Sequence, residues 1–373
     1  MINEEFIRED PFMKKLFIAL TVFIIYAAVL PVTGYGDQKA MFEHRYEYKL
    51  EDVLPATKFV QKQGYWEGHR DGKLVGYVGL SKDWTKNLVG YAGKHLETLM
   101  GMDRNGTITG VKLIYHSEPI VLIGLKEESY HNFIKQYIGM NIKDTISVGG
   151  AVSMDALTGA TVTAMVQNSI ILETLRKIAA QAGIIQIAKS KGRAISQNDT
   201  TMTWDELMKS GAVKNITVTT KELGISGEEV YLDLFIAVVT PPSIGRNLLG
   251  DVRYKQVMAE LKAGESAVAV FSRGKGSFKG TGFVRGGVFD RFNIEQGTKM
   301  HMFNDKDYRH VSELLAKGAP SINEGGVFII RNKDFDPTMP FKLNLVLPYR
   351  VSAIEKKFKS YSVEYGLAER FLK

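Results

Sequence analysis

Residues 155–163 read Asp-Ala-Leu-Thr-Gly-Ala-Thr-Val-Thr and lead into a long apolar segment with helical spacing. This stretch constrains the fold more than any other, because it gathers three threonine hydroxyls, a glycine and an acid at a helix N-terminus. The first turn of a helix has unpaired N–H groups and carries about half a positive charge, so it favours a phosphate. A threonine at this place can bind a phosphate or be esterified by one.

Ordinary helix capping is the alternative explanation of the same stretch. Thr158 would then be the N-cap, and Gly159 and Ala160 would form a tight entry into the helix. Capping accounts for one threonine and for the glycine, but it leaves the two later threonines and the upstream acid without a role. We therefore favour the phosphate interpretation.

The composition indicates a folded chain of more than one domain. Its 373 residues suffice for two or three domains, and 45% hydrophobic with 24% charged residues is typical of globular proteins. The formal net charge is +7, but the basic residues are spread along the sequence, which indicates a solvated surface rather than nucleic acid binding. No cysteine is present, so disulfides, iron–sulfur clusters and thiolate metal sites are excluded from this chain.

The histidines give no convincing metal-binding pattern. All seven are scattered, and none forms a His-x-x-x-His pair. Glu128 and His131 have the spacing of two ligands on one helix, but such a pair needs further ligands on a second helix, and the sequence offers none. We therefore predict a solvated helix face here and no metal site in this chain.

An uncharged apolar run at residues 16–32 predicts a membrane segment. Lys14 and Lys15 precede it, so its start is expected on the cytoplasmic side and the remainder of the chain on the outer side. The run is near the short limit for a spanning helix and also fits a long signal-peptide core. No A-x-A cleavage site follows, so we favour an uncleaved anchor over a cleaved signal or a buried helix.

The hydrophobic pattern predicts an α+β fold with an N-terminal membrane helix and two further domains. The expected parts are a cytoplasmic tip with the anchor at 1–36, a ligand-binding α+β domain at 37–185, a polar linker at 186–203, a mostly β domain at 204–350 and a charged tail at 351–373.

Hairpin and helix signals place the expected elements. In the first domain, strands are expected at 65–69 and 74–80 around Asp71-Gly72, at 95–102 and 107–115, and at 145–148, with helices at 126–138 and 160–182. In the second domain, helices are expected at 204–209 and 254–261, and strands at 215–220, 230–239, 267–272, 277–284, 288–294, 327–331 and 341–348. The tail at 352–373 is expected to be helical.

Two glycine-containing loops of the first domain are candidates to contact a ligand. One is Gly-Tyr-Ala-Gly-Lys at 90–94, and the other is His-Ser-Glu-Pro-Ile-Val-Leu-Ile-Gly at 116–124, directly after an expected strand. Loops on a rigid scaffold concentrate ligand contacts, and glycine lets the backbone approach a flat ring. A surface aromatic and a polar turn are the plain alternatives. The candidate contact residues are Tyr91, Gly93, His116 and Glu118.

Together, the two loops and the threonine stretch resemble the periplasmic flavin domain of the NosR/NirI family, membrane proteins that support nitrous oxide reductase. The stretch at 155–163 matches the D-x-x-[ST]-G-A-T-x-T pattern of proteins that carry covalent FMN. The same domain type occurs in FMN subunits of Rnf and sodium-pumping quinone reductase complexes, where the second loop usually reads His-x-Glu-Thr-Pro-Gly-Leu-Gly. Residues 119–121, Pro-Ile-Val, are closer to the NosR form, and the glycine-rich stretch at 276–291 resembles a NosR region that those subunits lack.

The resemblance covers most of residues 40–350 and implies an electron-transfer flavoprotein in denitrification. FMN would be attached through its phosphate to Thr163 by a separate flavin transferase. The recognition loop would consist of Asp155, Thr158, Gly159, Ala160 and Thr161. The cofactor itself would carry the redox chemistry, so no residue is assigned a catalytic role and the chain is not expected to be a self-contained enzyme.

The same resemblance implies the location and the partners. The chain would be anchored in the inner membrane with its bulk in the periplasm. It would accept electrons from a membrane donor, a quinol or an iron–sulfur subunit, and serve nitrous oxide reductase or its maturation factors.

One departure from the family leaves alternatives open. NosR-type proteins usually continue into membrane helices and a ferredoxin-like part with cysteine ligands, whereas this sequence stops at Lys373 without either. We expect a fragment, or a shortened member that obtains electrons from a separate subunit. An FMN subunit of an Rnf-like or quinone-reductase-like complex is one alternative function, and a flavin-free sensory or interaction module is another. The stretch at 276–291 is also compatible with a β-meander that binds nothing.

Overall fold

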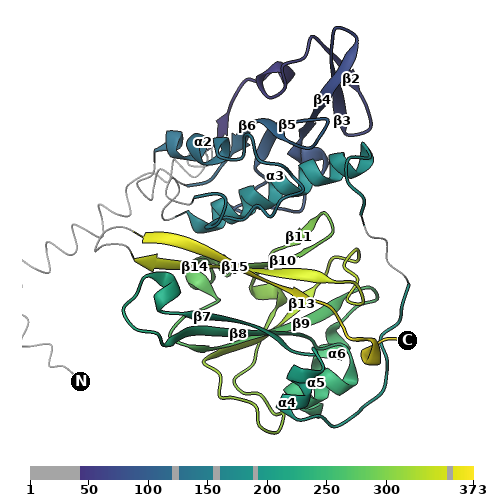
Figure 1. The fold of residues 1–373 in the computed structure, drawn as a ribbon, viewed down its shortest axis with the longest axis vertical. Coiled ribbons are helices and arrows are strands. Elements are labelled where there is room, and N and C mark those ends of the chain that lie inside the picture. The colour runs from purple at the N-terminus through teal and green to yellow at the C-terminus, as the bar shows by residue number, and fades with distance from the viewer. Residues whose placement is uncertain (1–42, 120–125, 154–159, 188–191, 351–355) are drawn as a thin grey trace, which may run out of the picture. The chain divides into compact units, whose positions relative to one another are not determined.

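The computed structural model describes residues 43–119, 126–153, 160–187, 192–350 and 356–373. These residues, from His44 onward, form one compact unit of helices and antiparallel sheets that is mostly β, so the predicted mixture of helices and strands is confirmed (Figure 1). The expected anchor at 16–32 lies outside the described residues. Among the helices that are described, none combines the length and the apolar character needed to cross a bilayer.

The first part of the chain forms an antiparallel sheet with the strand order β1-β6-β5-β4-β3-β2. Its strands are β1 His44–Arg45, β2 Lys58–Gln61, β3 Tyr65–Arg70, β4 Lys73–Leu80, β5 Glu97–Asp103 and β6 Ile108–His116. The predicted hairpin between β3 and β4 is confirmed: Asp71 and Gly72 join the strands with φ values of 50° and 73°. Two positive φ angles in succession give the tight turn that suits the twist of a hairpin.

Two helices pack on this sheet. Helix α2, Glu127–Lys135, lies against β6, and helix α3, Thr161–Gln181, lies against β4 and β5 (Figure 1). Both helices were predicted. In α2 the buried side chains are Tyr130, Phe133 and Ile134, as its apolar spacing indicates. The strand expected at 145–148 does not form, and Val148 makes only an isolated bridge with Val152.

Helix α3 is buried on nearly all sides. It contacts the first sheet and also strand β11, Lys299–His301, of the second part of the chain. Two of its buried polar side chains bond to tyrosines: Gln167 accepts a hydrogen bond from the Tyr130 hydroxyl at 2.7 Å, and Asn168 accepts one from the Tyr137 hydroxyl at 2.8 Å. The first sheet and the second part of the chain therefore share α3 as a common packing element.

The second part contains two antiparallel sheets with strand orders β12-β13-β9-β8-β7 and β11-β10-β14-β15. The strands of the larger sheet are β7 Lys214–Thr219, β8 Val230–Val238, β9 Ser266–Gly274, β12 Tyr308–His310 and β13 Glu324–Ile330. Besides β11, the smaller sheet contains β10 Phe292–Gln296, β14 Phe341–Arg350 and β15 Lys356–Tyr365. The helices are α4 Trp204–Lys209, α5 Pro242–Leu249, α6 Asp251–Glu260 and α7 Gly280–Gly286. Short 3-10 turns occur at Leu50–Asp52, Ser81–Asp83, Lys221–Leu223, Asp305–Asp307 and Glu369–Phe371.

Two sequence predictions for the second part were wrong. The strand expected at 277–284 is largely the short helix α7, which is bounded by Gly280 and Gly287 with φ values of 79° and 69°. The helix expected at 352–373 is replaced by β15, which pairs with β14 along its whole length. Pairing with β14, the strand that directly precedes it, overrides the weak local preference of a charged segment. The boundaries drawn at 186–203 and 351–373 remain predictions.

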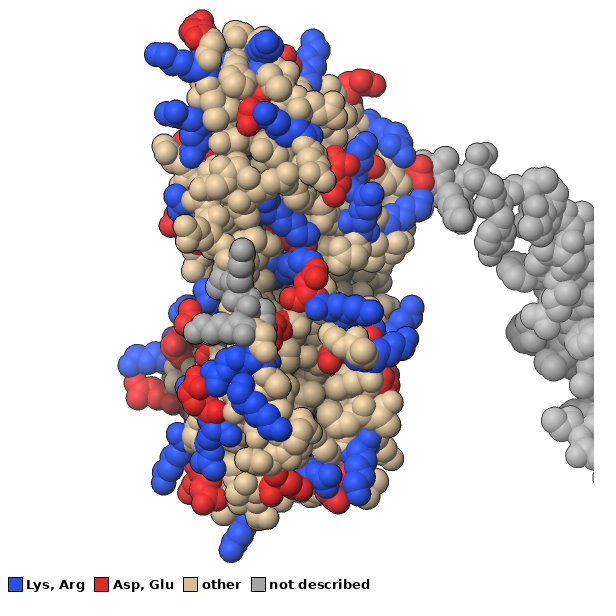
Figure 2. All heavy atoms as spheres, turned by 90° about the vertical axis from the view of Figure 1, so that its right-hand side faces the viewer, with Lys and Arg blue, Asp and Glu red and all other residues tan. Residues whose placement is uncertain are grey.

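The surface carries mixed charge. In the face that Figure 2 presents, Lys and Arg alternate with Asp and Glu over both parts of the chain. Several of these charges are exposed ion pairs, such as Lys221 with Glu228 and Lys275 with Glu229. This distribution agrees with the solvated surface expected from the spread of basic residues in the sequence.

Candidate functional site

The carboxylate of Glu118 joins the two predicted loops to the threonine stretch. The backbone N–H groups of Tyr91 and Ala92 each donate to it at 3.0 Å, and the hydroxyl of Thr163 also donates to it. Glu118 is 1% exposed and Thr163 is 3% exposed. Three segments that are far apart in sequence therefore meet at one buried acid, and a buried carboxylate needs such donors to be tolerated.

The loop at 90–94 is shaped to approach Glu118. A bridge between Val89 and His95 closes it, and Gly93 adopts a φ of 71° at its tip. Gly90 has no room for a side chain, because a Cβ atom there would lie 2.3 Å from Oε1 of Glu118. Glycine is thus needed at position 90 so that the loop can approach Glu118 closely, whereas Gly93 provides the positive φ angle of the turn.

Thr163 stands in the first turn of α3. The helix begins at Thr161, and its N-cap Ala160 makes no capping bond through a side chain. Thr161, Val162 and Thr163 are the first three helical residues, and their N–H groups precede the first intrahelical bond, which runs from Ala164 to Ala160. Asp155, Thr158 and Gly159 lie outside the described residues, so their predicted role in recognition remains a prediction.

His116 orients the loop that carries Glu118. Its side chain is 0% exposed and stacks on His44 with 4.7 Å between ring centroids. Nε2 lies 3.1 Å from Oε1 of Glu127, while Nδ1 accepts a hydrogen bond from the backbone N–H of Glu118 at 3.3 Å. Burial first, and then the charges of His44 and His131, lower the pKa of His116 to about 4. His116 is therefore neutral, and it acts on Glu118 through the backbone.

His44, His116 and Glu127 also have the spacing of a metal site, since their ligand atoms all lie within 4.8 Å of one another. The hydrogen bonds favour a different interpretation. When Nδ1 of His116 accepts from Glu118, the ring proton is on Nε2, which then donates to Glu127 and has no lone pair for a metal. The cluster ties β1, β6 and α2 together at the base of the loop.

The glycine-rich stretch of the second part lies against the same site, a contact that no motif in the sequence indicated. A Cβ atom at Gly282 would be 2.7 Å from a methyl group of Val162, and one at Gly286 would be 3.3 Å from the ring of Tyr91. Val162 is buried next to Thr163 at the start of α3. The repeated glycines were the available signal, because glycines close together in one segment allow another segment to approach it closely.

Residues 90–175 match the family described as the FMN-binding domain. This range contains Tyr91, Gly93, His116, Glu118 and Thr163, so all the candidate contact residues of the two loops fall inside it.

Curated relatives extend the similarity beyond that domain. "Regulatory protein NosR" of Stutzerimonas stutzeri is 32% identical over 355 residues, which is 87% of this chain and 49% of the relative. "Regulatory protein NosR" of Pseudomonas aeruginosa is 30% identical over 378 residues, which is 93% of this chain and 53% of the relative. "Protein NirI" of Paracoccus denitrificans is 29% identical over 293 residues, which is 74% of this chain and 42% of the relative.

The chain spans about half the length of the curated relatives that it matches. Within that span the similarity includes the second part of the chain as well as the flavin domain. The resemblance that the motifs indicated is therefore confirmed: over most of its length the chain is similar to NosR and NirI, and its residues 90–175 match the FMN-binding domain.

Proposed function

We propose that this chain is an electron-transfer flavoprotein that holds FMN as a phosphoester on Thr163. The observation that carries the proposal is the convergence of Tyr91, Glu118 and Thr163 inside the range that matches the FMN-binding domain. A buried threonine that merely capped α3 would need neither the loop at 90–94 nor a buried acid beside it.

The start of α3 suits a phosphate. Its first N–H groups have no intrahelical acceptor, and in the described part of the chain no side chain caps them. The helix is 21 residues long, so its N-terminal partial charge is fully developed. A phosphate esterified to Thr163 would lie beside these donors, where its negative charge is stabilised.

Glu118 has a defined part in this arrangement. Its carboxylate accepts the hydrogen bond of the Thr163 hydroxyl, which fixes the direction of Oγ. In attachment, the Thr163 oxygen would bond to the phosphorus of an activated flavin nucleotide held by the transferase, the phosphoanhydride bond of that nucleotide would break with loss of its leaving phosphate group, and Glu118 would take the hydroxyl proton. The N–H groups of Tyr91 and Ala92 would hold the protonated Glu118 side chain in place after this transfer. FMN would supply the redox chemistry when bound. The sequence contains no cysteine that could hold a redox centre in its place.

The wider setting belongs to the same proposal. Residues 16–32 would anchor the chain in the inner membrane and leave the described residues in the periplasm. A flavin transferase would attach FMN, a quinol or an iron–sulfur subunit would donate electrons, and nitrous oxide reductase or its maturation would receive them. The similarity to proteins named "Regulatory protein NosR" supports this setting.

The direct test is the mass of the peptide that contains Thr163. The full chain is expressed in membranes together with a flavin transferase, digested, and examined for an FMN-phosphoryl adduct. We expect the adduct on Thr163, its loss in Thr163→Ala and its retention in Thr163→Ser, because serine keeps the hydroxyl. An unmodified Thr163 peptide in the presence of active transferase would overturn the proposal.

A further inference from the structure

The hydroxyl of Thr163 is enclosed by protein. The residue is 3% exposed, and its hydroxyl donates to Glu118, which is 1% exposed. Attachment of a phosphate by a separate enzyme needs an accessible hydroxyl, because the oxygen must meet a nucleotide that the enzyme holds. Part of the surroundings of Thr163 therefore has to move before the ester can form, and the packing of the neighbouring segments decides which part that is.

Helix α3 itself is fixed. Arg176 bonds to Glu295 of β10 at 2.7 Å. The carboxylate of Glu173 accepts a hydrogen bond from the backbone N–H of Met300 at 3.2 Å. Both α3 side chains are buried, so movement of the helix would leave buried charges unpaired. The first turn of α3 therefore stays in place, and a segment that covers it has to move instead.

Residues 89–95, which we call the flap, lie over the attachment site. A bridge between Val89 and His95 closes the base of the flap. At its tip, the backbone N–H groups of Tyr91 and Ala92 donate to the carboxylate of Glu118 at 3.0 Å. Through these two bonds the flap covers the acid that binds the attachment hydroxyl.

The flap is anchored at its base and loosely packed at its tip. Leu88 and Leu96 flank it, are 7% and 0% exposed, and belong to one hydrophobic cluster. Nδ1 of His95 also lies 2.9 Å from the carbonyl oxygen of Leu88. By contrast, Tyr91 is 42% exposed, and a Cβ atom at Gly93 would meet no atom within 4 Å. Such packing is typical of a segment that opens locally while the rest of the domain stays folded.

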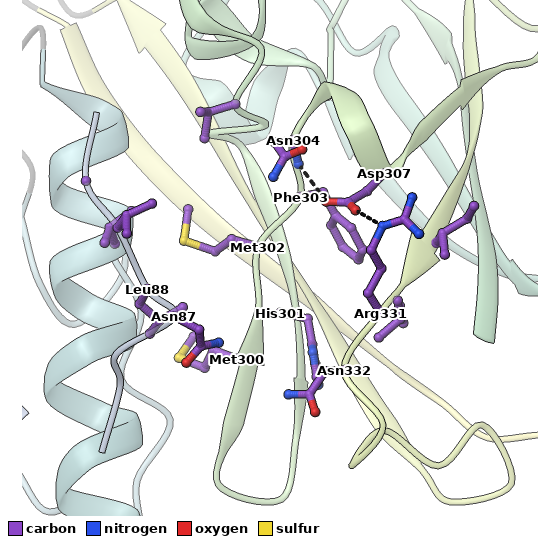
Figure 3. A pocket seen from close by; sticks show the side chains of 16 residues that line it. Asn87, Leu88, Met300, His301, Met302, Phe303, Asn304, Asp307, Arg331 and Asn332 are labelled. Atoms are coloured by element: carbon purple, nitrogen blue, oxygen red, sulfur yellow. Dashed lines mark hydrogen bonds and ion pairs between the residues drawn. The ribbon is translucent and has the colours of Figure 1, made fainter. Parts of the chain in front are cut away.

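A pocket of about 360 Å³ beside the flap gives it room to move (Figure 3). Residues 87–90 and α3 line one side of this pocket, and β11, β13 and their flanking residues line the other. Protein interiors are close-packed, so a buried segment can move only when its neighbours move as well. The first arm of the flap borders open space instead, which removes this obstacle on one side.

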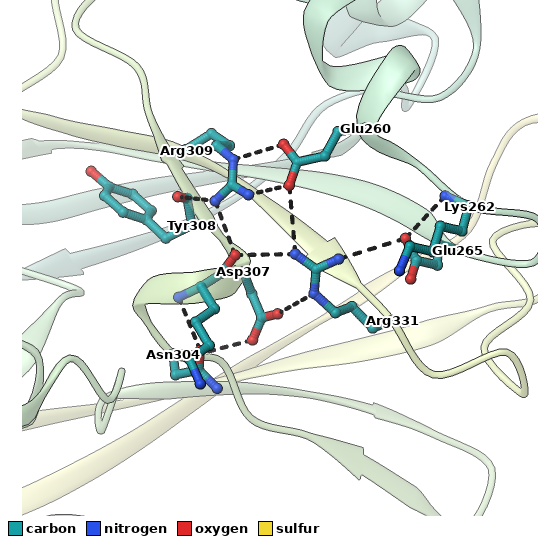
Figure 4. Close-up of polar contacts among 9 residues, drawn as sticks. Glu260, Lys262, Glu265, Asn304, Asp307, Tyr308, Arg309 and Arg331 are labelled. Atoms are coloured by element: carbon teal, nitrogen blue, oxygen red, sulfur yellow. Dashed lines mark hydrogen bonds and ion pairs between the residues drawn. The ribbon is translucent and has the colours of Figure 1, made fainter.

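An ion network holds the wall across the pocket. Nε of Arg331 lies 2.9 Å from Asp307. Its other nitrogens lie 3.5 Å from Glu260 and 3.7 Å from Glu265 (Figure 4). Arg309 donates to Glu260 at 2.8 Å and extends the network. Charges that are linked in a network hold their segments more firmly than an isolated surface pair does. Of the two sides of the pocket, the flap is therefore the one that can move.

Helix α7 of the second part holds the tip of the flap closed. The ring of Tyr91 lies against Gly286, where a Cβ atom would be 3.3 Å from the ring. Glycine at position 286 thus leaves the space that the ring occupies. Opening of the flap has to break this contact together with the two hydrogen bonds to Glu118.

We infer that the flap closes over Thr163 and opens to admit the flavin transferase, and that the ring of Tyr91 against α7 holds it closed. The inference rests on the proposed function, because it takes Thr163 as the point of attachment. It assigns the second part of the chain a regulatory role, since the packing on α7 sets how often the hydroxyl is exposed.

Thiol labelling measures the opening directly, because the chain has no cysteine of its own. Thr163→Cys places one thiol of similar size at the attachment position, where N-ethylmaleimide reacts with it only when the flap is open. Each rate is divided by the rate of the same variant unfolded in urea. We expect much slower labelling than in Val284→Cys, since Val284 is 83% exposed. Equal rates in the two variants would overturn the inference.

The role of Tyr91 is tested in the Thr163→Cys background. Tyr91→Ala removes the ring from α7 and should raise the labelling rate about ten-fold. Tyr91→Phe is the matched control, because it keeps the ring and should leave the rate nearly unchanged. The acceleration should appear without urea and depend weakly on it, since local opening exposes little surface. Labelling that follows global unfolding in all variants would overturn the inference.

Hydrogen exchange provides a test that needs no substitution at Thr163. In the unsubstituted chain, produced without transferase, the amides of Tyr91 and Ala92 should exchange faster than those of β5, which lies within the first sheet. Exchange of both segments at one common rate would mean that only global unfolding releases the flap, and it would contradict the inference.

These measurements need neither flavin nor transferase, so the two proposals fail separately. An FMN adduct on the Thr163 peptide, combined with labelling that Tyr91→Ala does not accelerate, would overturn the inference and leave the proposed function intact. A missing adduct, combined with labelling that Tyr91→Ala does accelerate, would overturn the proposed function and with it the purpose assigned to the flap.

Discussion

Thr163 and Glu118 are hydrogen-bonded to each other, side chain to side chain, across 45 positions of sequence. Both are almost fully buried, so neither can exchange this bond for one to water without movement of the surrounding loops. The bond makes the loop that follows β6 and the first turn of α3 a single unit, and several measurable effects follow from it.

Thr163→Ala should lower the free energy of unfolding by about 1–3 kcal/mol, because it removes one hydrogen bond to a buried charged group. Thr163→Ser should lower it by less, since the hydroxyl remains. Urea denaturation of the chain produced without flavin transferase measures both values free of any contribution from the cofactor. Equal losses for the two variants would indicate that the hydroxyl does not contribute to stability.

Glu118→Gln and Glu118→Ala should differ in flavin attachment. Tyr91 and Ala92 donate to different oxygens of Glu118, so the single amide oxygen in Glu118→Gln keeps one of these two acceptors, whereas alanine leaves both donors unpaired. We expect partial attachment in Glu118→Gln and almost none in Glu118→Ala, measured as the modified fraction of the Thr163 peptide. Full attachment in Glu118→Ala would contradict a positioning role for this acid.

Gly90→Ala should perturb the site while Gly93→Asn should not. A Cβ atom at Gly90 would lie 2.3 Å from Glu118, so one of the two must shift, at a cost of about 1–3 kcal/mol. Gly93 has open space around it, and asparagine tolerates its φ of 71° better than other side chains do. Thermal unfolding and flavin content of the two variants give the comparison, and similar behaviour would refute the close approach at Gly90.

The ion pair between Arg176 and Glu295 should contribute more to stability than an exposed pair. Their side chains are 9% and 19% exposed and 2.7 Å apart, and the pair links α3 to β10. Arg176→Ala leaves a largely buried carboxylate unpaired and should cost about 3 kcal/mol. Arg193→Ala is the control: its partner Glu369 is 83% exposed, so the loss should be about 1 kcal/mol or less. Equal losses in urea denaturation would contradict this ranking.

Stability should fall as the pH drops from about 7 towards 4. Burial first, and then the charge of Lys299, lower the pKa of His301 from 6.5 to about 4, and the pKa of His116 is lowered to about 4 as well. Between these values the unfolded chain binds more protons than the folded chain, so each histidine contributes stability above pH 6.5 that is lost on acidification.

His301→Gln tests this pH dependence, since glutamine cannot titrate. The variant should show a smaller change in the free energy of unfolding between pH 7 and pH 4.5, by up to about 3 kcal/mol. Urea denaturation at the two pH values provides the measurement, and an unchanged slope would mean that His301 is not buried in its neutral form.

The sequence predicts the elements that depend on local pattern. Asp71-Gly72 between two alternating segments indicates a hairpin, and the apolar spacing of Tyr130, Phe133 and Ile134 indicates α2, because turn chemistry and helical periodicity act over a few residues. The threonine stretch identifies the start of α3 for the same reason. These features hold in the structure where its residues are described.

The sequence does not predict what arises from distant contacts. Nothing local distinguishes 277–284 as a helix, because α7 depends on its packing against Val162 and on Asp290, which accepts the Gly282 N–H at 3.1 Å. Strand β15 is a different case: it pairs with the strand that directly precedes it, β14, and was missed because its charged residues were interpreted as a helical tail. Glu118 was a candidate by motif, but its link to Thr163 and the position of His301 become visible only in three dimensions.

The burial of α3 on nearly all sides has a mechanical consequence. Helix α3 packs against the first sheet on one side and against β11 on another. Arg176 and Glu173 also bond to residues of the second part. The helix therefore cannot rotate about its first turn. A group fastened to Thr163 would therefore not travel between donor and acceptor as a swinging arm. It would be a stationary relay, and the proteins on either side would have to come to it.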